Sequence, residues 1–156
     1  MHLDLDEFRA RSRGFYGRAA YEARHIDLFR RYFNSLAKAR GPVLIHCASG
    51  KDRTGILVAL THHLVGVHPD DLRADFLATN ALLGPRLPGL RKLAREAAGR
   101  EVADEDLLAR VSVGTDYIEA TFASMVERHG SVEGYLEQVL GVDTDVRARL
   151  LAQLIA

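Results

Sequence analysis

One short segment holds most of the side chains that could carry out chemistry. Residues 46–55 read His-Cys-Ala-Ser-Gly-Lys-Asp-Arg-Thr-Gly, so five residues separate Cys47 from Arg53. Apolar runs at 43–45 and 56–60 flank the segment and predict a buried strand before it and a buried helix after it. The amides of such a loop converge at the positive end of the helix dipole. That arrangement suits a phosphate dianion and lowers the pKa of a thiol at its centre.

Each side chain of this loop has a predicted role in binding or transferring a phosphoryl group. Cys47 is the expected nucleophile, Arg53 the bidentate ligand of the phosphate oxygens, and Thr54 a hydroxyl donor to the sulfur. His46 is expected to orient the loop through hydrogen bonds. The backbone amides are expected to cradle the phosphate, and they belong to Ala48, Ser49, Gly50, Lys51, Asp52 and Arg53.

Two roles are open to Asp52. It can protonate the leaving oxygen, or it can form a structural ion pair with Lys51 or another basic residue. Asp27, Asp4 and Asp6 are the fallback candidates for a general acid. Lys51 at the rim is expected to attract an anionic substrate, which favours highly charged phosphoesters.

The loop resembles the CX5R signature of the cysteine-dependent protein tyrosine phosphatases. Its Lys51-Asp52 pair is similar to the bacterial branch that also dephosphorylates phosphoinositides. Three later segments resemble the same branch, and they are residues 71–80, 116–120 and 129–136. The resemblance implies hydrolysis of phosphomonoesters of phosphotyrosine or phosphoinositide through a cysteinyl-phosphate intermediate, with no cofactor and no metal.

The resemblance also sets the expected fold class, which is α/β. Members of the family normally carry several strands before this loop, whereas residues 3–40 of this chain read as helix. We therefore expect a single domain over residues 1–156, a truncated or reduced C-terminal portion of the family fold with one clear strand, Val43–His46. A rival function follows from the same observation: a phosphate-binding module or inactive remnant that lacks the general-acid half of the fold.

Helical spacing of apolar residues dominates the rest of the chain. Gly84–Gly89 is the clearest break, and residues 84–113 are predicted to form either a mobile lid beside the loop or a solvated helix face. If the segment is a lid, four of its basic residues are expected to meet anionic substrate: Arg86, Arg91, Lys92 and Arg95. The expected helices are residues 19–39, 54–65, 90–98, 103–110, 116–128, 132–140 and 144–155, with a further one beginning at Pro69.

Composition excludes several classes of function. Lysine plus arginine equals aspartate plus glutamate at 21 each, so no basic field predicts nucleic-acid binding. The apolar run at 56–60 is too short for a membrane span. A single cysteine predicts no internal disulfide, and a cytoplasmic location is expected, with secretion open if the N-terminus is incomplete. His62-His63 lacks metal-ligand spacing, so packing is favoured there. A lone strand would leave two bare edges, so Val43–His46 is expected either to pack among helices or to be covered by a second copy in a homodimer.

Overall fold

The computed structural model describes residues 5–155, and every regular element among them is a helix. The first half contains α1 (Leu5–Ala19), α2 (Ala23–Leu36), α3 (Asp52–Leu64), α4 (Pro69–Ala78) and the short 3-10 helix η1 (Thr79–Leu82). The second half contains α5 (Leu83–Ala98), α6 (Asp104–Val111), α7 (Thr115–His129), α8 (Val132–Gln138) and α9 (Thr144–Leu154).

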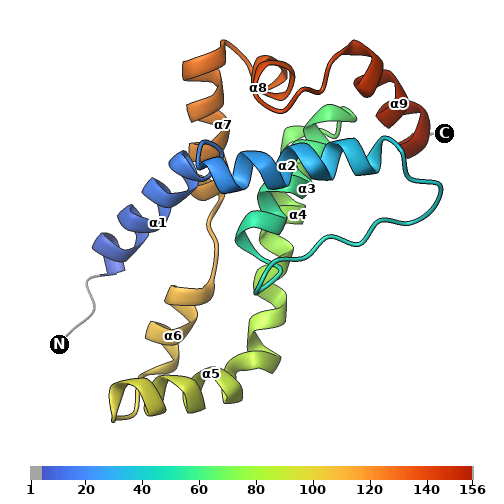
Figure 1. Cartoon of the computed structure of the whole chain (residues 1–156). Coiled ribbons are helices and arrows are strands. Elements are labelled where there is room, and N and C mark those ends of the chain that lie inside the picture. Colours follow the sequence, from blue (N-terminus) through green and yellow to red (C-terminus); the bar gives the residue numbers. More distant parts are fainter. Residues whose placement is uncertain (1–4, 156) are drawn as a thin grey trace.

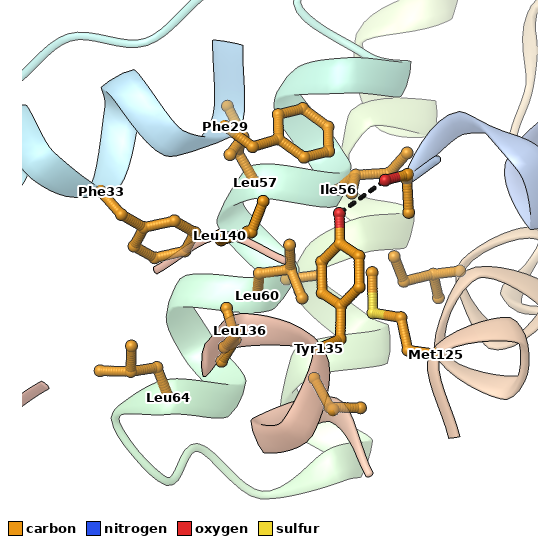
Figure 2. Close-up of a cluster of buried hydrophobic side chains, with 14 of the residues drawn as sticks. Phe29, Phe33, Ile56, Leu57, Leu60, Leu64, Met125, Tyr135, Leu136 and Leu140 are labelled. Carbon is orange, nitrogen blue, oxygen red and sulfur yellow. Dashed lines mark hydrogen bonds between the residues drawn. The ribbon is translucent and has the colours of Figure 1, made fainter. Parts of the chain in front are cut away.

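Helix α3 lies at the centre of the core because its apolar run is buried on several sides. Ile56 and Leu60 are fully buried on it, and α2 contributes Phe29 and Phe33. Figure 2 shows these side chains around Tyr135 of α8, whose hydroxyl donates a 2.7 Å hydrogen bond to the carbonyl of Ala20. The loop before α3 is therefore attached to a helix that is buried in the core.

Two features of the arrangement frame that loop (Figure 1). Helix α1 lies along α7, and α5 and α6 pack against each other as a pair that extends away from the remaining helices. The long connection between α2 and α3, residues 37–51, swings outward before it returns to the start of α3. The loop at residues 47–51 is thus approached by α1 and by the α5–α6 pair.

The predicted strand is absent from the described residues, so the α/β fold class is wrong for this structure. Val43–His46 is extended, but no neighbouring segment pairs with it. A strand exists only through its ladder of hydrogen bonds, so an extended segment without a partner is not one. Of its apolar side chains, Leu44 is 88% exposed, whereas Ile45 packs against the core. The predicted homodimer, which would cover this segment, stays a prediction.

The predicted break at Gly84–Gly89 is wrong, because α5 runs through it from Leu83 to Ala98. Pro85 falls in the first turn, where backbone amides need no helical partner. Pro88 removes one further hydrogen bond without ending the helix. The actual end comes at Gly99, which takes the left-handed conformation with φ of 67°.

The single helix expected at residues 19–39 is shorter than predicted, because the chain turns at residues 20–22 and α2 begins at Ala23. Buried Ala19 and Ala20 mark this corner, where their small side chains let α1 and α2 approach the core. The other predicted helices are present with small shifts at their ends. Within residues 5–155, no helix has the length and apolar character required to cross a bilayer.

Candidate active site

The loop that joins the extended segment to α3 has the backbone form that the sequence predicted. Gly50 has φ of 64°, in the left-handed region where side chains are disfavoured. Lys51 then precedes Asp52, the first residue of α3. The carbonyl of Lys51 accepts a 2.7 Å hydrogen bond from the amide of Gly55. The first amides of α3 therefore face the loop without helical partners, beside Cys47.

Cys47 lies in this cradle, half-buried. Partial burial by itself raises the pKa of its thiol. Hydrogen bonds from the Thr54 hydroxyl and from the backbone amides of Thr54, Ser49 and Lys51 outweigh burial and lower the pKa from 9.0 to about 6. Because donors favour the charged form of the group that accepts them, the sulfur is a thiolate at neutral pH.

The Thr54 hydroxyl has no acceptor other than this sulfur. Its oxygen is buried, and no group in residues 5–155 meets ordinary hydrogen-bond geometry with it. It nonetheless contributes to the lowered pKa of Cys47. Buried hydroxyls are almost always hydrogen-bonded. We therefore assign the thiolate as its partner.

Arg53 and Cys47 line the same open groove, whose volume is about 470 Å³. The other wall is α2, with Leu28, Arg31 and Tyr32. In the part of the chain that the structure describes, the guanidinium of Arg53 makes no ion pair and no hydrogen bond. Such a group is available to bind two oxygens of a phosphate.

Asp52 is held by a residue that the sequence did not single out. Its Oδ1 accepts a 2.7 Å hydrogen bond from the Tyr16 hydroxyl of α1. Lys51 Nζ lies 3.6 Å from the same oxygen, so the ion pair considered for these two residues is present. Tyr16 was missed because nothing in the sequence shows that α1 reaches the loop.

Lys51 does not extend freely into solvent. Its side chain is 18% exposed, and Nζ donates a 2.9 Å hydrogen bond to the carbonyl of Val111, the last residue of α6. Asn80 binds the backbone of Val113 through both its amide oxygen and its amide nitrogen. The end of α6 is thus fastened to the phosphate loop and to η1.

A second groove, of about 520 Å³, lies on the α5 side of the loop. Ser49, Lys51 and Asp52 form one wall, and Arg86 with apolar residues of α5 forms the other. Of the basic residues predicted to meet substrate, Arg91 and Arg95 pair instead with acidic residues of the same segment, Asp104 and Glu101. Arg86 alone of the four lines this groove. The lid assignment for residues 84–113 stays a prediction.

The remaining candidates are His46 and the fallback aspartates. His46 is exposed and makes no side-chain hydrogen bond with the described residues, so its orienting role stays a prediction. Asp27 pairs with Arg31 on the exposed face of α2. Asp6 is exposed near the start of α1, and Asp4 lies outside the described residues.

The histidine pair has protein partners. His63 Nε2 lies 2.8 Å from Glu133 Oε1, and His62 Nδ1 lies 3.8 Å from Asp75 Oδ2. Nowhere in residues 5–155 do three metal-binding side chains gather. The His63 contact ties α3 to α8, whereas His62 Nδ1 is buried without a hydrogen bond to the described residues.

A thiol of lowered pKa, an unpaired arginine and convergent helix amides form the constellation of cysteine-dependent phosphatases. The chain belongs to the tyrosine phosphatase family, whose family model matches residues 3–156.

Individual relatives agree with that assignment. The triple specificity protein phosphatase PtpB of Mycobacterium tuberculosis is 34% identical over 110 residues, which cover 65% of this chain and 40% of that protein. The protein H16_A0669 of Cupriavidus necator is 31% identical over 133 residues, 85% of this chain and 47% of the relative. A tyrosine-protein phosphatase of Nostoc commune is 30% identical over 118 residues, 71% of this chain and 39% of the relative. The chain spans less than half the length of each.

Proposed function

We propose that this chain hydrolyses phosphomonoesters, with phosphotyrosine as the first substrate class. The observation that carries the proposal is the thiol of Cys47, whose pKa is lowered to about 6 beside an unpaired Arg53. A module that only bound phosphate would gain nothing from a thiolate, because a second anion at the site repels the ligand.

The proposed reaction has two steps. The Cys47 sulfur attacks phosphorus, the bond from phosphorus to the phenolic oxygen breaks, and that oxygen leaves with the electron pair and takes a proton from Asp52. Water then attacks phosphorus, gives a proton back to Asp52, and the sulfur departs as a thiolate. Arg53 and the loop amides stabilise the charge on the equatorial oxygens in both steps.

The test is hydrolysis of 4-nitrophenyl phosphate from pH 5 to 8 in the presence of a chelator. Wild type should release nitrophenolate, and Cys47→Ser should release none above background. Binding of phosphate or vanadate by a folded wild type without any turnover would contradict the proposal and support the phosphate-binding module instead.

Phosphoinositides are a second candidate substrate class, favoured by the groove on the α5 side. Lys51 and Arg86 supply positive charge there, and Leu90 and Leu93 supply apolar surface. A phosphorylated inositol attached to a lipid combines negative charge with an apolar chain, and it therefore complements both parts of the groove. The mycobacterial relative is named a triple specificity phosphatase, which supports a site that accepts more than one class of substrate.

Three variants test this second candidate. Lys51→Ala and Arg86→Ala should reduce hydrolysis of a short-chain phosphatidylinositol phosphate more than hydrolysis of 4-nitrophenyl phosphate. Lys92→Ala removes an exposed charge of α5 that does not line the groove, so it should leave both rates unchanged. Equal losses for the two substrates in Lys51→Ala and Arg86→Ala would contradict the phosphoinositide assignment.

A further inference from the structure

Tyr16 joins the N-terminal helix to the predicted general acid. Its side chain is 1% exposed, and its hydroxyl donates a 2.7 Å hydrogen bond to Asp52 Oδ1, from a position 36 residues earlier in the chain. Asp52 itself lies at the first position of α3, beside the phosphate cradle. Helix α1 therefore contributes a group that touches the loop, although it carries none of the loop's sequence motif.

The ring of Tyr16 is fixed on three sides by aromatic contacts. The ring of Phe15 precedes it in α1 at 5.6 Å, Phe76 of α4 lies edge-on at 5.9 Å, and Tyr117 of α7 lies at 5.2 Å. Its backbone carbonyl also accepts a 3.0 Å hydrogen bond from the Thr121 hydroxyl of α7. A side chain packed in this way holds its hydroxyl at one place without further ordering cost when substrate binds.

The Tyr16 hydroxyl keeps its proton, and is therefore a donor, around neutral pH. Burial is the first cause that raises its pKa far above the ordinary value, and the hydrogen bond to Asp52 and the negative charges of Asp52 and Cys47 raise it further. Tyr16 therefore does not exchange protons during turnover. Its effect on Asp52 is one of geometry.

That geometry distinguishes the two oxygens of Asp52. Oδ1 is engaged by the Tyr16 hydroxyl and faces Lys51 Nζ at 3.6 Å. No hydrogen bond to Oδ2 is found in residues 5–155, so Oδ2 is the oxygen that remains for a proton. Rotation of the carboxylate about its last bond would exchange the two oxygens, and the bond from Tyr16 opposes that rotation.

We propose that Tyr16 is a positioning residue, which holds Asp52 by Oδ1 so that Oδ2 gives its proton to the leaving oxygen. The proposal rests on the proposed function, in which Asp52 is the general acid. Its specific content is that Tyr16 acts through Asp52 alone, and not through the thiolate or the phosphate cradle.

The dependence of kcat on the leaving group distinguishes an effect through Asp52 from an effect through the thiolate or the phosphate cradle. A general acid matters most when the departing oxygen is basic, so phenyl phosphate needs it more than 4-nitrophenyl phosphate does. Asp52→Asn should lower kcat for phenyl phosphate by about 100-fold, within the usual range for general acid catalysis, and for 4-nitrophenyl phosphate by much less. Tyr16→Phe should follow the same pattern with a smaller loss, about tenfold on phenyl phosphate.

Tyr135→Phe is the matched control. It removes the hydroxyl of another fully buried tyrosine, whose 2.7 Å hydrogen bond goes to Ala20 and not to the loop. It should lower stability without changing the ratio of the two rates. The two rates are compared as a ratio within one preparation, so unfolded chains, which hydrolyse neither substrate, do not affect the result for Tyr16→Phe.

The double variant Tyr16→Phe with Asp52→Asn completes the cycle. If Tyr16 acts only through Asp52, the double variant should be no slower than Asp52→Asn alone. An additional loss in the double variant, or equal losses for both substrates in Tyr16→Phe, would overturn the positioning role. A loss in Asp52→Asn that does not depend on the leaving group would instead refute Asp52 as the acid, so the two failures are distinguishable.

Discussion

The thiolate of Cys47 gives the sharpest test of the electrostatics of the loop. With a pKa of about 6 in place of 9.0, about 90% of the thiol is ionised at pH 7, against about 1% without the loop. Thr54→Val keeps the shape of the side chain and removes the only hydroxyl donor to the sulfur. The pKa of Cys47 should therefore rise.

The size of that rise follows from the kind of interaction removed. Hydrogen bonds to charged groups contribute about 1.5–3 kcal/mol, which corresponds to about one to two pH units. Cys47 is only half-buried, so solvent screens the interaction and we expect the lower end, about one unit. The backbone amides of Ser49, Lys51 and residue 54 should keep the pKa below 9.0 even in the variant.

Alkylation by iodoacetate, followed from pH 4.5 to 9, measures this pKa directly. We use the inflection of the profile and not its plateau, because a thiolate of higher pKa is also intrinsically more reactive. The inflection should lie near pH 6 in wild type and about one unit higher in Thr54→Val. Thr61→Val, on the same helix with its hydroxyl bonded to the carbonyl of Leu57, should leave it in place. An unchanged inflection in Thr54→Val would refute the assigned contact with sulfur.

Four further predictions follow from the site and its supports. Arg53→Lys should lower kcat/KM for 4-nitrophenyl phosphate by about 100-fold or more, because an ammonium cannot bind two phosphate oxygens in parallel; a loss of less than threefold would contradict its role. Gly55→Ala would place a Cβ 2.8 Å from the ring of Phe76 and should cost about 1–3 kcal/mol in urea denaturation, with a smaller cost in a Phe76→Leu background. Between about pH 6 and 9 the folded thiol has lost its proton while the unfolded thiol retains it. The free energy of unfolding of wild type relative to Cys47→Ser should therefore rise with pH across that window and fall as pH drops toward 6. A difference that is flat with pH would be inconsistent with the lowered pKa. The homodimer favoured by the bare extended segment and by exposed Leu44 predicts twice the chain mass in light scattering at micromolar concentration, and the chain mass alone would exclude it.

The loop was predictable from sequence because its chemistry depends on residues that lie next to one another. The spacing of Cys47 and Arg53, the glycine at position 50 and the apolar run into α3 all act within a few residues, and the structure places them as that local pattern indicated. The prediction of a strand at Val43–His46 was wrong for the opposite reason. Its apolar character is local, but a strand requires a partner elsewhere, which no pattern within the segment can reveal.

The difference between local and long-range determinants also explains why the contact of Tyr16 and the extent of α5 were not predicted. Tyr16 meets Asp52 across 36 residues of chain, and only the packing of α1 against α7 brings them together. In α5, Pro85 and Pro88 signal a break, but the position of Pro85 in the first turn depends on where η1 ends. Long-range packing decides both outcomes, so sequence patterns do not single out Tyr16, and they place the start of the helix at residue 90 instead of at Leu83.

The hydrogen bond from Lys51 to Val111 has a thermodynamic consequence for the α5–α6 pair. One ammonium serves the phosphate loop and also caps the carbonyl end of α6, where the helix dipole is negative. A ligand phosphate that draws Lys51 toward itself must weaken that cap. Linkage is reciprocal, so whatever holds α6 in place also reduces the affinity for such a ligand by the same factor. The affinity for phosphate therefore depends on how stably the end of α6 is held, and the side chain of Lys51 alone couples the two.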